Sequence, residues 1–275
     1  MNNGFCRIIC IRSFECPKAS HTINRPNLAL LAAVLAVALA WAPARGDQRY
    51  AVSGTDQYTI GRANLSSNIS YAGTQHLTVA RRGKATRFSA RVRYSRTSQG
   101  NTSPSTASFA QEMTPAGELK DTANLDPDYL TVLNQPFAVQ LDAATLMDIR
   151  RLSGRVPFDF PSPMTGGSLR GFLQRGPSSR FGAVPVIAVT FDAVGPMRGP
   201  LPGHPNVSIR GTMRMNGTAY YSLRTALLMG LNETLTIDGN LREHARLTPV
   251  TIVYRRSIKA QEAPPLTEAA ASPAR

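Results

Sequence analysis

The residues that could carry chemistry in this sequence are scattered, and no catalytic motif joins them. His76, His204 and His244 lie far apart, with no HExxH motif and no nearby cysteine, so we expect no dedicated metal site. The chain has neither a GxSxG elbow nor an SxxK pair, and it has no glycine-rich loop of the kind that binds phosphates. We therefore predict a protein that is not an enzyme, with no catalytic residue, metal or cofactor.

One carboxylate, Asp159, stands out because it lies between Phe158 and Phe160 in the stretch GRVPFDFPSPMTGG, residues 154–167. The prolines of this stretch forbid a helix and remove hydrogen-bond donors from a strand ladder, so we predict an extended linker. The two phenylalanines would dock the preceding helix on the sheet, and a lid over a ligand is the alternative. Catalysis by Asp159 together with Asp192 and Asp238 would need these residues to converge, which their spacing does not indicate.

Positive charge is the strongest electrostatic feature. The formal net charge is +14, which favours anionic partners. Arg87, Arg91 and Arg93 fall on one face of an alternating strand, so we predict that they bind an anionic group or surface. Nucleic acid is disfavoured because Phe88 and Tyr94, which could stack on bases, fall on the opposite face. A solvated sheet face is the ordinary alternative for such arginines.

The N-terminal region has the pattern of an export signal. Residues 28–40 are all Leu, Ala or Val, and Ala42-Pro43-Ala44 resembles a small-x-small cleavage site. We predict that residues 1–44 are a signal peptide with a long n-region, and that the protein is periplasmic or secreted; a retained membrane anchor is the alternative. All three cysteines precede residue 28, so no disulfide-linked partner is expected.

Most of the remaining chain alternates apolar and polar residues, which is typical of half-buried β-strands. We predict one antiparallel β domain over residues 45–260 with nine or ten strands, and a disordered tail over residues 261–275. One short α-helix is expected from Asp142, as N-cap, to Leu152. Residues 95–106 are expected to be a mobile loop. The predicted fold class is mostly β: an antiparallel meander that forms an open half-barrel or a sandwich, with the helix packed on it.

Methionines mark the apolar face of this predicted sheet. Met213 and Met215 share the apolar side of a strand that we expect to turn, or to form a glycine bulge, at Asn216-Gly217. Met197 lies in a Gly/Pro-rich segment, residues 195–205, that could rim a cavity or form an ordered crossover. Flexible thioethers adapt to apolar ligands, so we predict that Met197, Met213 and Met215 bind a ligand.

The meander over residues 206–259, the long preceding hairpins and the methionines Met213, Met215 and Met229 resemble the open half-barrel of periplasmic lipoprotein carriers of the LolA/LppX type. The resemblance covers residues 50–259 and implies a curved sheet that holds acyl chains on its concave side. We therefore predict a binding protein for a lipid or other amphiphile. The alternative is a cell-envelope protein that binds acidic polymer or the membrane surface through its basic face, as a peripheral contact.

Overall fold

The strands in the described part of the chain belong to one antiparallel sheet. The computed structural model describes residues 46–61, 65–82, 84–113, 119–120, 128, 130–134, 139–141, 143–161, 168–201, 204–243 and 246–261. The expected signal peptide, 1–44, lies outside the described residues, as does the expected tail apart from Gln261, which belongs to the last strand. The described strands form a sheet of eleven, more than the nine or ten predicted.

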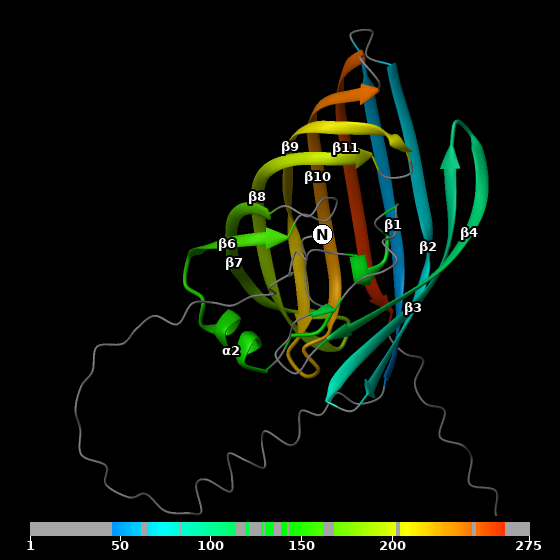
Figure 1. Ribbon diagram of the computed structural model, residues 1–275. Helices are drawn as coiled ribbons and strands as arrows, with labels where there is room; N and C mark the ends of the chain where they lie inside the picture. The colour runs from blue at the N-terminus through cyan, green and yellow to red at the C-terminus, as the bar shows by residue number, and fades with distance from the viewer. Residues whose placement is uncertain are drawn as a thin grey trace, which may run out of the picture.

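The strand order in space is β5-β4-β3-β2-β1-β11-β10-β9-β8-β7-β6 (Figure 1). The strands are β1 (Gly46–Ile60), β2 (Leu65–Arg82), β3 (Ala85–Ser98), β4 (Asn101–Met113), β5 (Leu119–Lys120), β6 (Arg155–Pro161), β7 (Ser168–Phe181), β8 (Val184–Leu201), β9 (His204–Ser222), β10 (Leu228–Glu243) and β11 (Arg246–Gln261). The edge strands β5 and β6 do not pair with each other, so the sheet curls without closing. This confirms the open half-barrel and excludes the sandwich.

Two meanders meet in the middle of the sheet. β1 to β5 run outward to one edge, β6 to β11 run back from the other edge, and β1 pairs with β11 from Arg49↔Gln261 to Ile60↔Val250. Because β5 and β6 are opposite edges, the connection between them must cross the whole width of the sheet. This connection contains the 3₁₀ helix η1 (Val132–Asn134) and the helix α2 (Ala143–Arg151).

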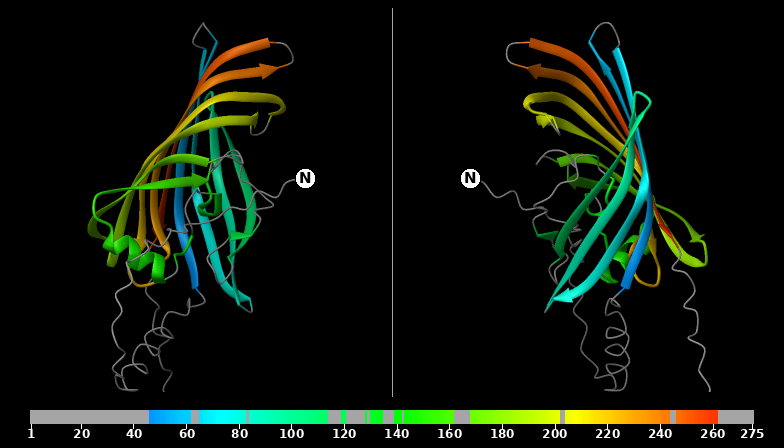
Figure 2. Two further views of the ribbon diagram at one scale, coloured as in Figure 1. Left: turned by 60° about the vertical axis from the view of Figure 1, so that its left-hand side comes forward. Right: turned by 90° about the vertical axis from the view of Figure 1, so that its right-hand side faces the viewer.

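The sheet has an apolar inner face and a polar outer face. On β3, Phe88, Ala90, Val92 and Tyr94 are buried and Arg87, Arg91 and Arg93 are exposed, which confirms the predicted alternation. We call the side of the buried residues the inner face. Figure 2 shows that the sheet curves around this side.

The connection buries apolar side chains against the inner face. The predicted helix is confirmed as α2, and Leu146 and Ile149 are buried on one side of it; the predicted N-cap, Asp142, lies outside the described residues. The other buried apolar side chains of the connection are Leu130, Val132, Leu133, Val139 and Leu141. Within the described ranges, no helix has the length and hydropathy needed to cross a bilayer.

Two segments predicted to be irregular form strands instead. Residues 95–106 are a β3–β4 hairpin whose turn consists of Gln99 and Gly100, both with positive φ. The polar Ser and Thr residues suggested a loop, but β-branched Thr fits a strand well when its face meets solvent. Residues 155–161 of the proline-rich stretch are β6, an edge strand, and its edge position explains why Pro157 is tolerated. Residues 162–167 of that stretch lie outside the described residues.

Two segments that we predicted to interrupt strands also lie within strands. β8 runs to Leu201 and pairs with β9, so residues 195–201 are strand rather than an irregular crossover, and residues 202 and 203 lie outside the described residues. Asn216-Gly217 lies inside β9 rather than in a turn. Gly217 is required there because a Cβ would lie only 2.1 Å from the carbonyl oxygen of Asn232 on the neighbouring strand. The close approach of β10, not a turn, therefore accounts for this glycine.

Candidate functional site

The residues predicted to bind a ligand are divided between the two faces. Met197, Met213 and Met215 lie on the inner face and are 0–1% exposed. Arg87, Arg91 and Arg93 are exposed on the outer face. The sheet therefore separates the methionines from the arginines, and a ligand bound on the inner face would not contact those arginines through it.

The outer arginines lie beside further cations. Across the strands, Arg49 of β1 is level with His76 of β2 and Arg91 of β3. In the next exposed row, Lys259 of β11 and Arg93 of β3 lie on either side of Ala51 and Thr74. We call Arg49, Arg91, Arg93 and Lys259 the outer basic cluster. It spans four strands and can attract an anionic surface.

A second group of charges lies on the inner face, where none was predicted. Among the described residues, the buried charged side chains are Asp56, Glu233 and Arg256, all no more than 4% exposed. Arg256 of β11 is level with Gly54 of β1 on one side and with Glu233 of β10 on the other. We call Asp56, Glu233 and Arg256 the inner charge cluster.

Arg256 is the centre of this cluster. An Nη atom lies 2.6 Å from a carboxylate oxygen of Asp56, and the guanidinium stacks near the rings of Tyr71 and Tyr254 at 5.3 Å. Its Nε donates to the carbonyl oxygen of Asp128 at 2.9 Å, and an Nη donates to the carbonyl oxygen of Thr55. These bonds replace the water that a buried guanidinium loses.

Gly54 makes this position possible. A Cβ at residue 54 would lie 2.8 Å from an Nη of Arg256 and 2.8 Å from the carbonyl oxygen of Arg255. Because position 54 has no side chain, Arg256 can lie flat across β1 and reach Asp56.

The cluster also ties the connection to the sheet. The hydroxyl of Tyr71 donates to Asp56 at 2.7 Å and approaches the carboxylate of Asp128 at 3.2 Å. The hydroxyl of Tyr94 donates to the same carboxylate at 2.5 Å. Asp128 is part of the connection, so three inner-face side chains, those of Tyr71, Tyr94 and Arg256, hold this point of it against the sheet. Nearby, the backbone N–H of Val132 donates to the buried side chain of Gln75.

Burial changes the acidity of both carboxyls in the cluster. It raises the pKa of Glu233 to about 8, although the positive charge of Arg256 offsets part of the effect. It also raises the pKa of Asp56, against the opposing charge of Arg256 and the hydrogen bond from Tyr71. One carboxyl oxygen of Glu233, Oε2, is buried and has no hydrogen-bond partner. Glu233 is therefore mainly neutral at pH 7 and has unused hydrogen-bonding capacity.

The sequence did contain a signal for this cluster. Arg256 occupies an inward position in the run Ile252, Tyr254, Arg256 and Ile258, and Glu233 does so between Leu231 and Leu235. A charge at an inward position of an alternating strand is rare unless it is paired, so it marks a special site. What the sequence did not show is that β1 lies beside β11.

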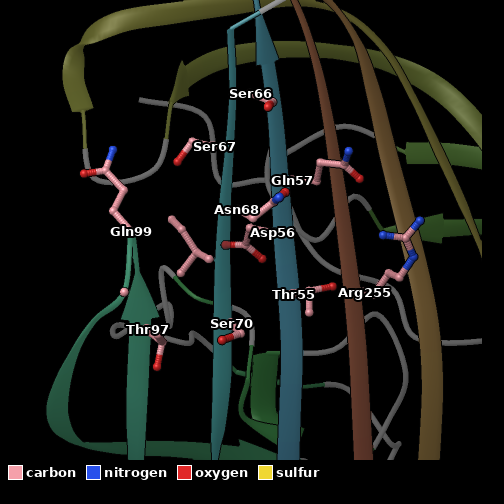
Figure 3. A pocket seen from close by; sticks show the side chains of 12 residues that line it. Thr55, Asp56, Gln57, Ser66, Ser67, Asn68, Ser70, Thr97, Gln99 and Arg255 are labelled. Atoms are coloured by element: carbon pink, nitrogen blue, oxygen red, sulfur yellow. The ribbon is translucent and has the colours of Figure 1, made fainter.

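The outer face contains an open pocket of about 580 Å³ over β1, β2 and the tip of the β3–β4 hairpin (Figure 3). Its lining consists mainly of hydroxyl and amide side chains, with Arg255 at one side. The pocket lies further along β1 than the outer basic cluster.

Comparisons with known proteins give only distant likenesses. The chain matches neither a protein-family model nor a curated protein sequence. Among solved structures it is similar to lipovitellin, in a structure of its lipid–protein interactions, with 11% identity and a TM-score of 0.41. That likeness covers 83% of this chain and 26% of lipovitellin, so the chain spans about a quarter of that protein's length.

Two bacterial structures are more distant. DynF, from the dynemicin biosynthesis pathway of Micromonospora chersina, has 6% identity and a TM-score of 0.24 over 82% of this chain and 85% of that one. A candidate AttH protein of Nitrosomonas europaea has 9% identity and a TM-score of 0.22 over 79% and 53%. With every TM-score below 0.5, these likenesses identify neither a family nor a ligand. The resemblance to lipid-binding carriers thus stays loose.

Proposed function

We propose that the protein is an exported, non-enzymatic binding protein that holds a lipid or another amphiphile on the inner face of its sheet. The observation that carries the proposal is the composition of that face. It is apolar across many strands of an open sheet, and its buried charges among the described residues are gathered in the inner charge cluster. Apolar walls with a few convergent polar groups are the usual make-up of a small-molecule site.

The apolar part would hold an acyl chain. Met197, Met213 and Met215 come from adjacent strands, and their flexible side chains can repack around a chain of variable shape. They are buried now, so a ligand has to take the place of side chains that cover them. Apolar side chains of the connection pack in the same core, so the proposal requires them to move aside.

The polar head would meet Glu233. This carboxyl is mainly protonated at pH 7 and has an oxygen without a hydrogen-bond partner, so it can donate to an ester, hydroxyl or carboxylate group. Arg256, by contrast, is already bonded to Asp56, Asp128 and Thr55. Glu233 is therefore the better candidate for head-group recognition.

Export and lack of catalysis rest on the sequence. The apolar segment 28–40 with its small-x-small end supports export. The absence of a recognisable nucleophile, metal or phosphate motif in the sequence supports a binding role.

A fluorescent fatty acid tests the inner site. Parinaric acid should gain fluorescence on binding to the protein, and Met197→Gln and Met213→Gln should weaken its binding at least tenfold because each places an amide against the acyl chain. The matched controls Met197→Leu and Met213→Leu should keep the affinity within about threefold, because volume and apolarity are retained. Circular dichroism identifies which variants remain folded. Unchanged binding by folded glutamine variants would contradict the proposal, as would no binding by the unmodified protein.

A second candidate function is supported by the outer basic cluster. Its four cations on β1, β3 and β11, with Arg87 nearby on β3, suit a peripheral contact with acidic polymer or anionic membrane. The triple variant Arg87→Gln, Arg91→Gln, Arg93→Gln should then lose salt-sensitive sedimentation with vesicles rich in phosphatidylglycerol. Equal sedimentation of the triple variant and the unmodified protein would rule this function out.

A further inference from the structure

The pocket on the outer face lies apart from the methionines of the inner face and from the outer basic cluster. Twelve residues line its volume of about 580 Å³, which lies in the range of small-ligand sites. They are Thr55, Asp56, Gln57, Ser66, Ser67, Asn68, Ile69, Ser70, Thr97, Gln99, Gly100 and Arg255.

The register of the sheet explains why these side chains converge. One row of side chains that point to the outer face crosses four neighbouring strands. It consists of Thr97 on β3, Ser70 on β2, Thr55 on β1 and Arg255 on β11. Gln57 and Asn68 form the adjacent pair on β1 and β2. In Figure 3, Thr97 and Gln99 lie on the β3 side of the pocket and Arg255 on the opposite side.

The hairpin turn at the rim has a strained residue. Gln99 has φ of 51° and Gly100 has φ of 80°. Glycine adopts this left-handed conformation freely, but glutamine does so at a cost, and such strain is often found where a side chain is held for binding. The turn places the side-chain amide of Gln99 at the rim of the pocket.

The chemistry of the lining selects the ligand. Eight of the twelve residues have uncharged hydroxyl or amide side chains, which can both donate to and accept from sugar hydroxyls. Arg255 is exposed and can bind a carboxylate with two hydrogen bonds. Asp56 belongs to the inner charge cluster, where its carboxylate is paired with Arg256, so the free charge of the pocket is positive.

Other ligand classes fit less well. The lining includes no aromatic residue on which a base could stack. Its one large apolar residue, Ile69, is a buried inner-face side chain, so the pocket offers no surface for an acyl chain. A small bare anion would leave most of the hydroxyl and amide groups unused.

We propose that this pocket binds an acidic sugar residue of a polysaccharide, with Arg255 on the carboxylate and the Ser, Thr, Asn and Gln side chains on the hydroxyls. A short oligosaccharide needs only the pocket, so the inner face and the outer basic cluster are not involved.

Calorimetric titration with trigalacturonate tests this site. The unmodified protein should bind trigalacturonate, and Arg255→Gln should weaken binding at least tenfold. Arg214→Gln is the matched control, because it removes an exposed cation from the outer face of β9, outside both the pocket and the outer basic cluster, and it should change the affinity less than twofold. Gln99→Gly should also weaken binding while it relieves the backbone strain, so a folding defect cannot explain that loss.

Three results would overturn the proposal. They are no binding of trigalacturonate at millimolar concentration, an equal loss in the Arg255 and Arg214 variants, and equal affinity for a neutral galactose trisaccharide. None of them affects the parinaric acid experiment, so this site and the inner site succeed or fail separately.

Discussion

Replacement of Glu233 by glutamine should remove much of the pH dependence of stability. Burial raises the pKa of Glu233 to about 8, whereas an unfolded glutamate titrates near 4.5. The folded state therefore keeps the proton to a higher pH than the unfolded state, and the free energy of unfolding falls as the pH rises from about 4.5 to about 8. The pKa difference corresponds to a loss on the order of 5 kcal/mol.

Glu233→Gln keeps the shape of the side chain and cannot ionise. The variant should match the unmodified protein near pH 5 and be several kcal/mol more stable than it at pH 8. Urea unfolding followed by circular dichroism at pH 5, 6, 7 and 8 measures both. Asp56 and Arg256 are present in both proteins, so the difference between the two curves isolates Glu233. The exposed Glu243 on the same strand supplies the control Glu243→Gln, which should leave the pH dependence unchanged. Parallel curves for the Glu233 variant and the unmodified protein would refute the reasoning.

Three further predictions test the structure by urea unfolding at pH 7. Arg256→Met leaves the buried Asp56 without its cation and should lower the free energy of unfolding by about 3–5 kcal/mol. Addition of Asp56→Asn should recover much of that loss. A loss below about 1 kcal/mol in the single variant would contradict the buried ion pair. Gly54→Ala should cost about 1–3 kcal/mol because its Cβ meets Arg256 and a backbone oxygen, and a neutral result would mean that Arg256 lies elsewhere. Phe160→Ala should cost about 3–5 kcal/mol, because the ring is fully buried against Phe158 and Phe191. Asp159→Asn, exposed beside it, should change stability by less than about 0.5 kcal/mol. A larger loss for Asp159→Asn than for Phe160→Ala would contradict the packing of β6.

The alternation in the sequence was enough to predict the faces of the sheet. Side chains two apart in a strand share a face, so Phe88 and Val92 could be placed inward and Arg91 outward without knowledge of the neighbouring strands. The helix could be predicted as well, because Leu146 and Ile149 recur at helical spacing before Gly154. Both patterns are local.

The inward charges are visible in the sequence, but their pairing in the inner charge cluster could not be predicted because it depends on long-range strand pairing. Asp56 and Arg256 are 200 positions apart, and nothing local indicates that β1 pairs with β11. For the same reason Asn216-Gly217 looked like a turn, although the close approach of β10 is what requires a glycine there. The outer pocket likewise depends on the register of four strands.

Native mass spectrometry tests the proposed function most directly. The full chain would be expressed with its own N-terminal segment in bacterial cells, and the protein recovered from the periplasm would be sprayed from a non-denaturing buffer. The amphiphile proposal predicts a lipid-sized adduct that dissociates on collisional activation and decreases in the folded Met213→Gln variant but not in Met213→Leu. A bare polypeptide mass, together with failure to bind parinaric acid, would contradict a ligand on the inner face.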